Sequence, residues 1–163
     1  MSEQHAREHR YATRVDWSGA SRGPTKTYAG YSREHTIVVE GKPQLTGSAD
    51  PAFRGDASLY NPEELLLAAL SSCHLLSYLA QCAREGIAVV SYSDDAVATM
   101  SEKGGAGRFT SATLRPVVEI DDERIERATS LHDEAREQCF IANSVNFPVE
   151  HEPVVRRVVR SHA

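Results

Sequence analysis

The chain has 163 residues, with 18 basic and 23 acidic side chains and a net charge of -5. This length fits one domain whose core needs no disulfide or structural metal, and the acidic balance argues against nucleic acid or an anionic membrane as a partner. Residues 1–10 are polar, so we expect a disordered tail there without a secretory signal, then a single domain over residues 11–163, in the cytoplasm.

Strand-like runs over residues 11–17, 25–31 and 35–40 are separated by turns rich in Gly, Ser and Pro. This pattern predicts a three-stranded meander. Residues 41–60 lack periodicity and contain many Gly, Pro, Ser and Asp residues, which predicts a long loop. Because long loops in compact domains are often functional, Arg54 within it is a candidate site residue.

The clearest helix begins at Asn61, which is suited to cap it, with Pro62 at the first helical position and Glu63 facing the positive end of the dipole. It is expected to end near Glu85, before Gly86. Apolar residues occupy nearly every side, so protein should bury it almost all round. A membrane span is not expected, because polar residues interrupt the apolar run: Ser71, Ser72, His74, Ser77 and Gln81.

Two long strand-like segments follow, over residues 88–101 and 108–120. The glycine-rich residues 102–107 join them, which predicts a hairpin. This glycine run lacks the lysine and the following helix of a phosphate-binding loop, so a turn is the better interpretation.

A second helix is expected to begin near Asp121 or Asp122, with apolar residues at three- and four-residue spacing and Cys139 near its end. Residues 148–159 then predict a last strand, in which Pro153 indicates an edge or a bulge.

The three cysteines are the candidate chemical groups. Cys73 and Cys82 lie nine residues apart on one helix, on opposite faces and ~13 Å apart along its axis. That is too far for a disulfide, so Cys139 is the partner that the helix leaves open to Cys73. In the alternative interpretation, all three cysteines are simply small buried hydrophobic residues. Their spacing offers no zinc site, and no metal or cofactor is expected.

Cys73 lies three turns inside its helix, beyond the reach of the helix dipole, so another cation must stabilise a thiolate there. An arginine of the long loop is a better candidate than the neighbouring His74, which points to another side of the helix. Glu63 could orient that arginine, yet it lies ten residues before Cys73, or ~15 Å. The simplest arrangement takes Glu63 from a second chain, in an obligate homodimer with antiparallel central helices. A plain charge at the helix start is the alternative for Glu63.

Two further interpretations remain open. A cysteine hydrolase would need a histidine base, for which His132 is available without any favourable spacing. A redox sensor or a ligand-binding module would use the same thiols without turnover.

At these residues the chain resembles the OsmC/Ohr family of osmotically inducible and organic hydroperoxide resistance proteins. The resemblance rests on the run from Asn61 through Glu63 to Cys73, on Cys139 with Asn143 downstream, and on the order of elements. It is nearer the OsmC-like branch. Two departures are Phe140, where a proline usually follows the second cysteine, and a longer loop over residues 41–60.

The resemblance implies an α+β fold of the OsmC-like type, in which antiparallel sheets surround a long buried central helix in an intertwined homodimer. It implies a cytoplasmic, dithiol-dependent peroxidase for organic hydroperoxides, without nucleic acid or membrane as a partner. By position, Cys73 would be the peroxidatic thiolate and Cys139 the resolving thiol, joined in a disulfide during turnover. Glu63 would orient Arg54, with Arg22 as the alternative arginine.

Overall fold

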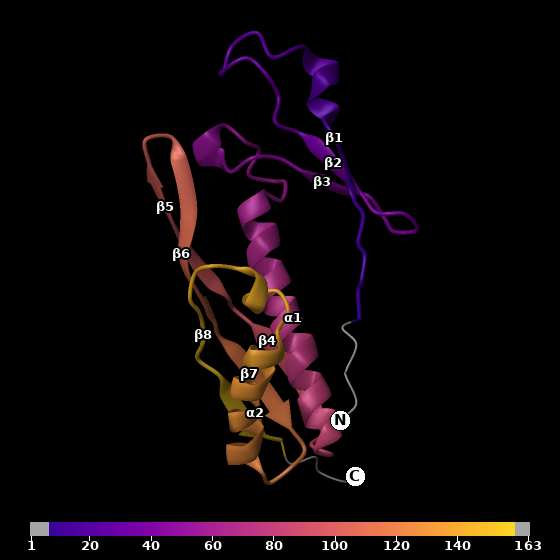
Figure 1. Cartoon of the computed structure of the whole chain (residues 1–163), viewed down its shortest axis with the longest axis vertical. Helices are drawn as coiled ribbons and strands as arrows, with labels where there is room; N and C mark the ends of the chain where they lie inside the picture. Colours follow the sequence, from indigo (N-terminus) through magenta and orange to yellow (C-terminus); the bar gives the residue numbers. More distant parts are fainter. Residues whose placement is uncertain (1–6, 159–163) are drawn as a thin grey trace. The chain divides into compact units, whose positions relative to one another are not determined.

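A computed structural model describes residues 7–158 (Figure 1). The α+β class is confirmed. The two long helices and nine strands of the described residues are β1 (Arg14–Asp16), β2 (His35–Val38), β3 (Leu45–Gly47), α1 (Pro62–Arg84), β4 (Val89–Asp94), β5 (Val97–Lys103), β6 (Ala106–Leu114), β7 (Pro116–Ile120), α2 (Ile125–Gln138), β8 (Val149–His151) and β9 (Val154–Arg157). Short 3-10 helices lie at Ser18–Arg22, Pro51–Phe53 and Ala142–Ser144.

Contacts divide the chain into two units, one up to Leu65 and one from Leu66 onward. The single domain expected over residues 11–163 stays a prediction. The tail expected over residues 1–10 lies mostly outside the described residues. Residues 7–10 are exposed and belong to no helix or strand.

The first unit contains the predicted meander, but with a different third strand. The sheet order is β1-β2-β3, with both pairs antiparallel. The strand predicted over residues 25–31 is wrong: the guanidinium of Arg33 stacks on the rings of Tyr28 and Tyr31 and donates hydrogen bonds to their carbonyls. These two carbonyls accept hydrogen bonds from Arg33 and not from a neighbouring strand. The third strand, β3, lies inside the predicted long loop.

The start of α1 follows the sequence prediction. The Asn61 side chain accepts a hydrogen bond from the Glu64 backbone N–H at 2.8 Å, and Glu64 Oε2 accepts one from the Asn61 backbone N–H at 3.1 Å. This reciprocal pair satisfies two N–H groups that the helix itself leaves unpaired. At the other end Gly86 adopts a φ of 67°, and the Ile87 N–H returns to the Cys82 carbonyl at 2.9 Å.

The expectation that protein buries α1 nearly all round is wrong for the single chain. Its buried residues form one stripe: Leu70, His74, Tyr78, Gln81 and Cys82. Other apolar positions stay open, and Leu76 is 68% exposed. By length and composition α1 would also pass as a membrane span, a test that core helices pass as well.

The predicted hairpin is confirmed as a pairing but is broken into two parts. β5 pairs with β6 around a two-residue turn of Gly104 and Gly105, and β4 pairs with β7. At the break, Asp94 accepts hydrogen bonds from the Arg115 backbone N–H at 2.6 Å and from the Ser71 hydroxyl at 2.5 Å. The two parts therefore belong to different three-stranded sheets.

The last predicted strand is also divided. Pro153 separates β8 from β9, because proline has no N–H to donate to a ladder. β8 pairs with β6 and β9 with β7, both in parallel, so the sheets of the second unit are mixed and not wholly antiparallel as expected. The predicted end at Val159 lies outside the described residues.

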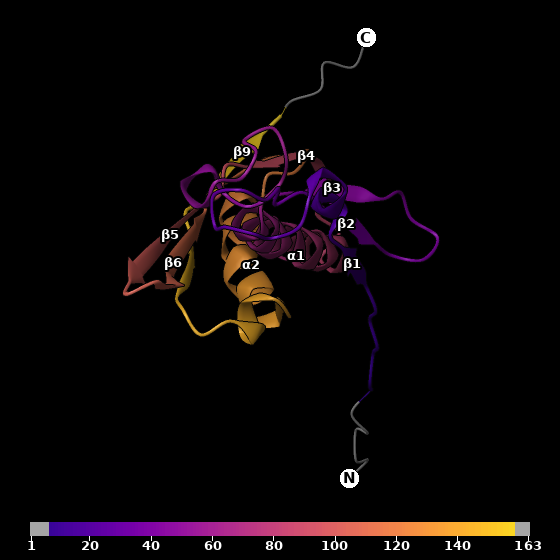
Figure 2. The ribbon, with the colours of Figure 1, turned by 90° about the horizontal axis from the view of Figure 1, so that it is seen from above.

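α2 begins at Ile125, three residues after Asp122, because the Asp122 carboxylate accepts a hydrogen bond from the Arg124 backbone N–H and pairs with its guanidinium. It lies beside the C-terminal half of α1 (Figures 1 and 2). Arg127 near the start of α2 forms an ion pair with Glu85 after the end of α1, so the two helices run antiparallel. One buried cluster joins them to the sheet of β4, β7 and β9, through Tyr78, Cys82, Val118, Ile120 and Leu131.

Candidate functional site: two thiols beside a groove

The structure brings Cys73 and Cys139 together, both within the second unit. Cys73 is half-buried in the middle of α1, whereas Cys139 is buried at the C-terminal cap of α2. Burial, together with the neighbouring Cys73 thiol, raises the pKa of Cys139 to about 11. The Ala142 backbone N–H also donates to Cys139 Sγ at 3.5 Å. Cys139 is therefore a protonated thiol at neutral pH, and Cys73 is the more accessible of the two.

Cys82 is separate from this pair, as predicted. It is 1% exposed and lies in the buried cluster of the second unit. Burial raises its pKa, and the nearby Tyr78 side chain opposes this shift. Among the residues that the structure describes, all three cysteines are free thiols.

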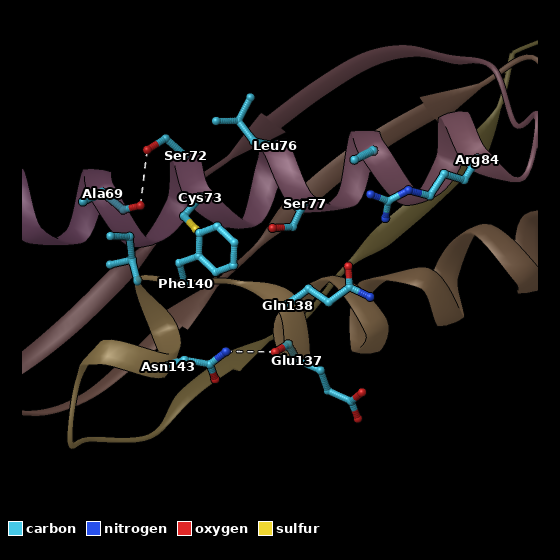
Figure 3. A pocket seen from close by; sticks show the side chains of 12 residues that line it. Ala69, Ser72, Cys73, Leu76, Ser77, Arg84, Glu137, Gln138, Phe140 and Asn143 are labelled. Atoms are coloured by element: carbon cyan, nitrogen blue, oxygen red, sulfur yellow. Dashed lines mark hydrogen bonds between the residues drawn. The ribbon is translucent and has the colours of Figure 1, made fainter. Parts of the chain in front are cut away.

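A cavity of about 640 Å³ runs along one side of α1 and reaches Cys73. Figure 3 shows Cys73, Ser77 and Arg84 of α1 pointing toward the end of α2 and the segment after it. Ser72 and Leu76 project from the other side of α1, and the Glu137 carboxylate points away from this helix. Most of the lining is apolar or uncharged: Ala69, Ser72, Cys73, Leu76, Ser77, Ala80, Gln138, Phe140, Ile141 and Asn143. Arg84 and Glu137 complete it. A small apolar molecule could therefore bind against the Cys73 sulfur.

The two candidate arginines lie in the first unit and line the same pocket, of about 450 Å³. Arg22 forms an ion pair with Glu34 at 2.8 Å. Arg54 follows the turn Pro51–Phe53 with a φ of 64°, in the left-handed region that an arginine rarely adopts. Its guanidinium has no hydrogen bond or ion pair within residues 7–158, so Arg54 is the arginine left available for another partner.

Glu63 also has an unpaired group. Its Oε2 is buried without a hydrogen-bond partner among the described residues. A buried carboxylate oxygen without a donor is costly, so this oxygen is available to accept a further hydrogen bond. Glu63 and Arg54 belong to the first unit and Cys73 to the second, so their meeting stays a prediction.

The structure contains a stack of aromatic rings that the sequence did not predict. His74 and His132 are 1% and 0% exposed, and His74 Nε2 lies 2.9 Å from His132 Nδ1. The Tyr78 ring stacks on that of His132 at 3.8 Å, and the His151 ring lies 5.6 Å from that of His74. The only sequence signal was helical spacing: His74 lies four residues before Tyr78, and His132 seven before Cys139.

This stack removes the support for a cysteine hydrolase. His132 bonds to His74, and its other nitrogen, Nε2, is buried without a partner among residues 7–158. In that part of the chain neither Cys73 nor Cys139 has a histidine as a hydrogen-bond partner. The same residues hold no group of three His, Cys, Asp or Glu side chains placed to bind a metal ion.

Comparison with known proteins agrees with this geometry. A family model described as OsmC-like protein matches residues 55–153. The chain belongs to the OsmC-like family. An OsmC-like protein of unknown function from Vibrio cholerae is 31% identical, with a TM-score of 0.82 over 90% of this chain and 100% of that one. Among curated protein sequences, none matches this chain significantly.

Two more distant OsmC-like structures show the same fold. An organic hydroperoxide resistance protein from Elizabethkingia anophelis is 17% identical, with a TM-score of 0.64 over 93% of this chain and 100% of that one. An organic hydroperoxide resistance protein from Legionella pneumophila is 18% identical, with a TM-score of 0.61 over 91% of this chain and 98% of that one. At this identity they support the fold alone, and the fold class expected from the resemblance is confirmed.

Proposed function

We propose that this OsmC-like protein is a cysteine peroxidase that reduces organic hydroperoxides to alcohols. The contact between the Cys73 and Cys139 thiols at the wall of an apolar groove carries this proposal. The names of the Elizabethkingia and Legionella proteins support the same activity.

In the first step the Cys73 thiolate attacks the distal oxygen of the hydroperoxide. The O–O bond breaks, the alkoxide takes a proton and leaves as alcohol, and the sulfur becomes a sulfenic acid. In the second step the Cys139 thiol displaces the hydroxyl group from that sulfur, which gives a Cys73–Cys139 disulfide and water. A dithiol then reduces the disulfide and is itself oxidised to a disulfide.

The groove supports organic over inorganic peroxide as the substrate. Leu76, Ala80, Phe140 and Ile141 offer apolar contact to an alkyl or aryl group but no hydrogen-bonding side chain. Hydrogen peroxide would gain none of this contact. We therefore expect kcat/KM for tert-butyl hydroperoxide to exceed that for hydrogen peroxide.

The arginine and its carboxylate complete the proposed site in a homodimer. A guanidinium beside Cys73 would stabilise the thiolate and the negative charge that develops on the oxygens. The available guanidinium of Arg54 and the unpaired oxygen of Glu63 support this pairing. Because Glu63 lies ~15 Å from Cys73 along α1, we propose that the partner subunit supplies it. The open apolar side of α1 supports such a partner.

The test is hydroperoxide consumption with a dithiol present. The wild type should turn over repeatedly, Cys73→Ser should not react, and Cys139→Ser should react once and stop. Cys82→Ser is the matched control, because that thiol lies outside the groove, and it should behave as wild type. Full activity of Cys73→Ser would overturn the proposal. A single stoichiometric oxidation of the wild type would instead indicate a redox sensor.

The arginine assignment has its own comparison. Arg54→Ala should lower the rate of Cys73 oxidation by about 10² or more, as expected for loss of a charge-stabilising donor. Arg22→Ala should change it little, since Glu34 already pairs with Arg22. The reverse result would assign Arg22. We also propose that a dithiol is the reductant in the cell and that the protein acts in the cytoplasm.

A further inference from the structure

The buried ring stack lies between the two helices that carry the thiols. His74 is next to Cys73 on α1, and His132 lies two turns before Cys139 on the same face of α2. The hydrogen bond between these rings therefore joins the two helices at the level of the site. The ion pair between Arg127 and Glu85 lies farther away, at the start of α2.

Both rings are neutral at physiological pH. Burial, with smaller contributions from the neighbouring histidines, lowers the pKa of His74 to about 4 and that of His132 to about 3. Asp94 of β4 opposes the shift at His74. The other titratable groups around the stack are His151 of β8, which bonds to Asp133, the buried Tyr78 and Cys82, and the partly buried Tyr92.

The hydrogen bond has a direction. One ring must donate an N–H and the other must accept with a bare nitrogen. His132 Nε2 is buried without a partner among the described residues, and an unpaired acceptor is tolerated better than an unpaired N–H. We therefore assign the proton to His132 Nδ1, which donates to His74 Nε2.

We propose that His74 and His132 are positioning residues, whose hydrogen bond holds Cys139 within reach of Cys73. Neither ring forms a hydrogen bond with a sulfur in the part of the chain that the structure describes, so both act through the packing of α2 on α1. This inference rests on the proposed function only in that Cys139 is taken as the resolving thiol. The geometry of the two thiols can be measured without any peroxide.

The measurement is the equilibrium of the Cys73–Cys139 pair with glutathione. Oxidised glutathione takes two electrons from the two thiols, which yields the protein disulfide and two reduced glutathione molecules. The equilibrium constant gives the effective concentration of one thiol at the other, a direct measure of their positioning. A Cys82→Ser background removes the third thiol.

Two pairs of variants separate the hydrogen bond from the filling of the core. In His132→Asn and His74→Gln an amide group replaces the bonded ring nitrogen, so the effective concentration should stay within about threefold of wild type. In His132→Leu and His74→Asn the bond is lost, and a fall of about tenfold or more is expected. His74→Asn keeps an amide that is one methylene too short, so a failure of the leucine variant to fold leaves the test intact.

Ile120→Ala is the matched control, because it opens a cavity in the same buried cluster but leaves both histidines of the hydrogen bond in place. It should leave the effective concentration unchanged. Alkylation of Cys73 in the reduced variants should also proceed at the wild-type rate, which a general loosening of α1 would not allow.

Three results would overturn the inference: a wild-type effective concentration in the folded disrupting variants, an equal loss in the amide variants that keep the bond, or an equal loss in Ile120→Ala. Failure of the proposed function has a different signature. The wild type would then consume no hydroperoxide. The equilibrium with glutathione would still differ between the wild type and the histidine variants that lose the hydrogen bond.

Discussion

The buried thiol of Cys139, at the C-terminal cap of α2, lies beside the half-buried thiol of Cys73 in the middle of α1. The two sulfurs differ in access, and burial raises the pKa of Cys139, although both are cysteines of one site. The difference assigns their roles, because the thiolate is the nucleophile and an exposed sulfur meets substrate first.

The first prediction concerns the order in which the thiols react. At pH 7 a thiol with a pKa of about 11 is ionised in only about one molecule in 10⁴. Iodoacetamide should therefore label Cys73 first, Cys139 much more slowly and the buried Cys82 last. Mass spectrometry of peptides taken over time measures this order. In urea the three rates should converge, and faster labelling of Cys139 in the folded protein would contradict the assignment.

The second prediction concerns acid stability. The folded pKa values of His74 and His132 lie below the value of about 6.5 expected in the unfolded chain. Between these values the unfolded state binds more protons, so the free energy of unfolding falls as pH drops below about 6.5, until both rings are protonated near pH 3. At pH 5 the loss relative to pH 7 should be about 2 kcal/mol for each ring.

Urea denaturation at several pH values, followed by far-UV circular dichroism, measures this loss. The double variant with His74→Gln and His132→Asn lacks both titrating rings and is the control. Its free energy of unfolding should change less over the same pH range. An equal pH dependence in the double variant would show that other groups cause it.

Local signals in the sequence were enough to predict α1. Asn61, Pro62 and Gly86 act within one turn of the helix ends, so the prediction needs no knowledge of the rest of the fold. β3 could not be found in the same way. Its place in the sheet depends on Arg33 binding the chain around Tyr28 and Tyr31, a contact that no periodicity shows.

The candidate site was predictable only in part. Helix geometry excluded Cys82 and left Cys139 for Cys73, and the structure places these two thiols together. The ring stack was missed because His74, His132 and His151 come from three elements that meet only in the folded chain. Single histidines on buried helix faces carry no pattern that distinguishes them from isolated core residues.

The third prediction concerns the backbone at Arg54. A φ of 64° strains any residue with a Cβ, and such strain often persists at functional sites. Arg54→Gly should raise the free energy of unfolding of the first unit by up to ~1 kcal/mol while abolishing peroxidase activity. Trp17, the single tryptophan of the chain, reports on this unit by fluorescence. Phe53→Gly, at a neighbouring residue with negative φ, should instead lower the stability.

The last prediction concerns the open side of α1. Ala68 is exposed there and does not line the groove, so a second subunit packed on this side would contact it. Ala68→Arg should convert the proposed homodimer to monomer, because a buried unpaired guanidinium costs more than the surrounding contacts supply. Analytical ultracentrifugation gives the mass. Ser130→Arg, an exposed change on α2, is the control and should leave the dimer intact. A wild type that sediments as a monomer would contradict the shared site, and with it the supply of Glu63 by the partner subunit.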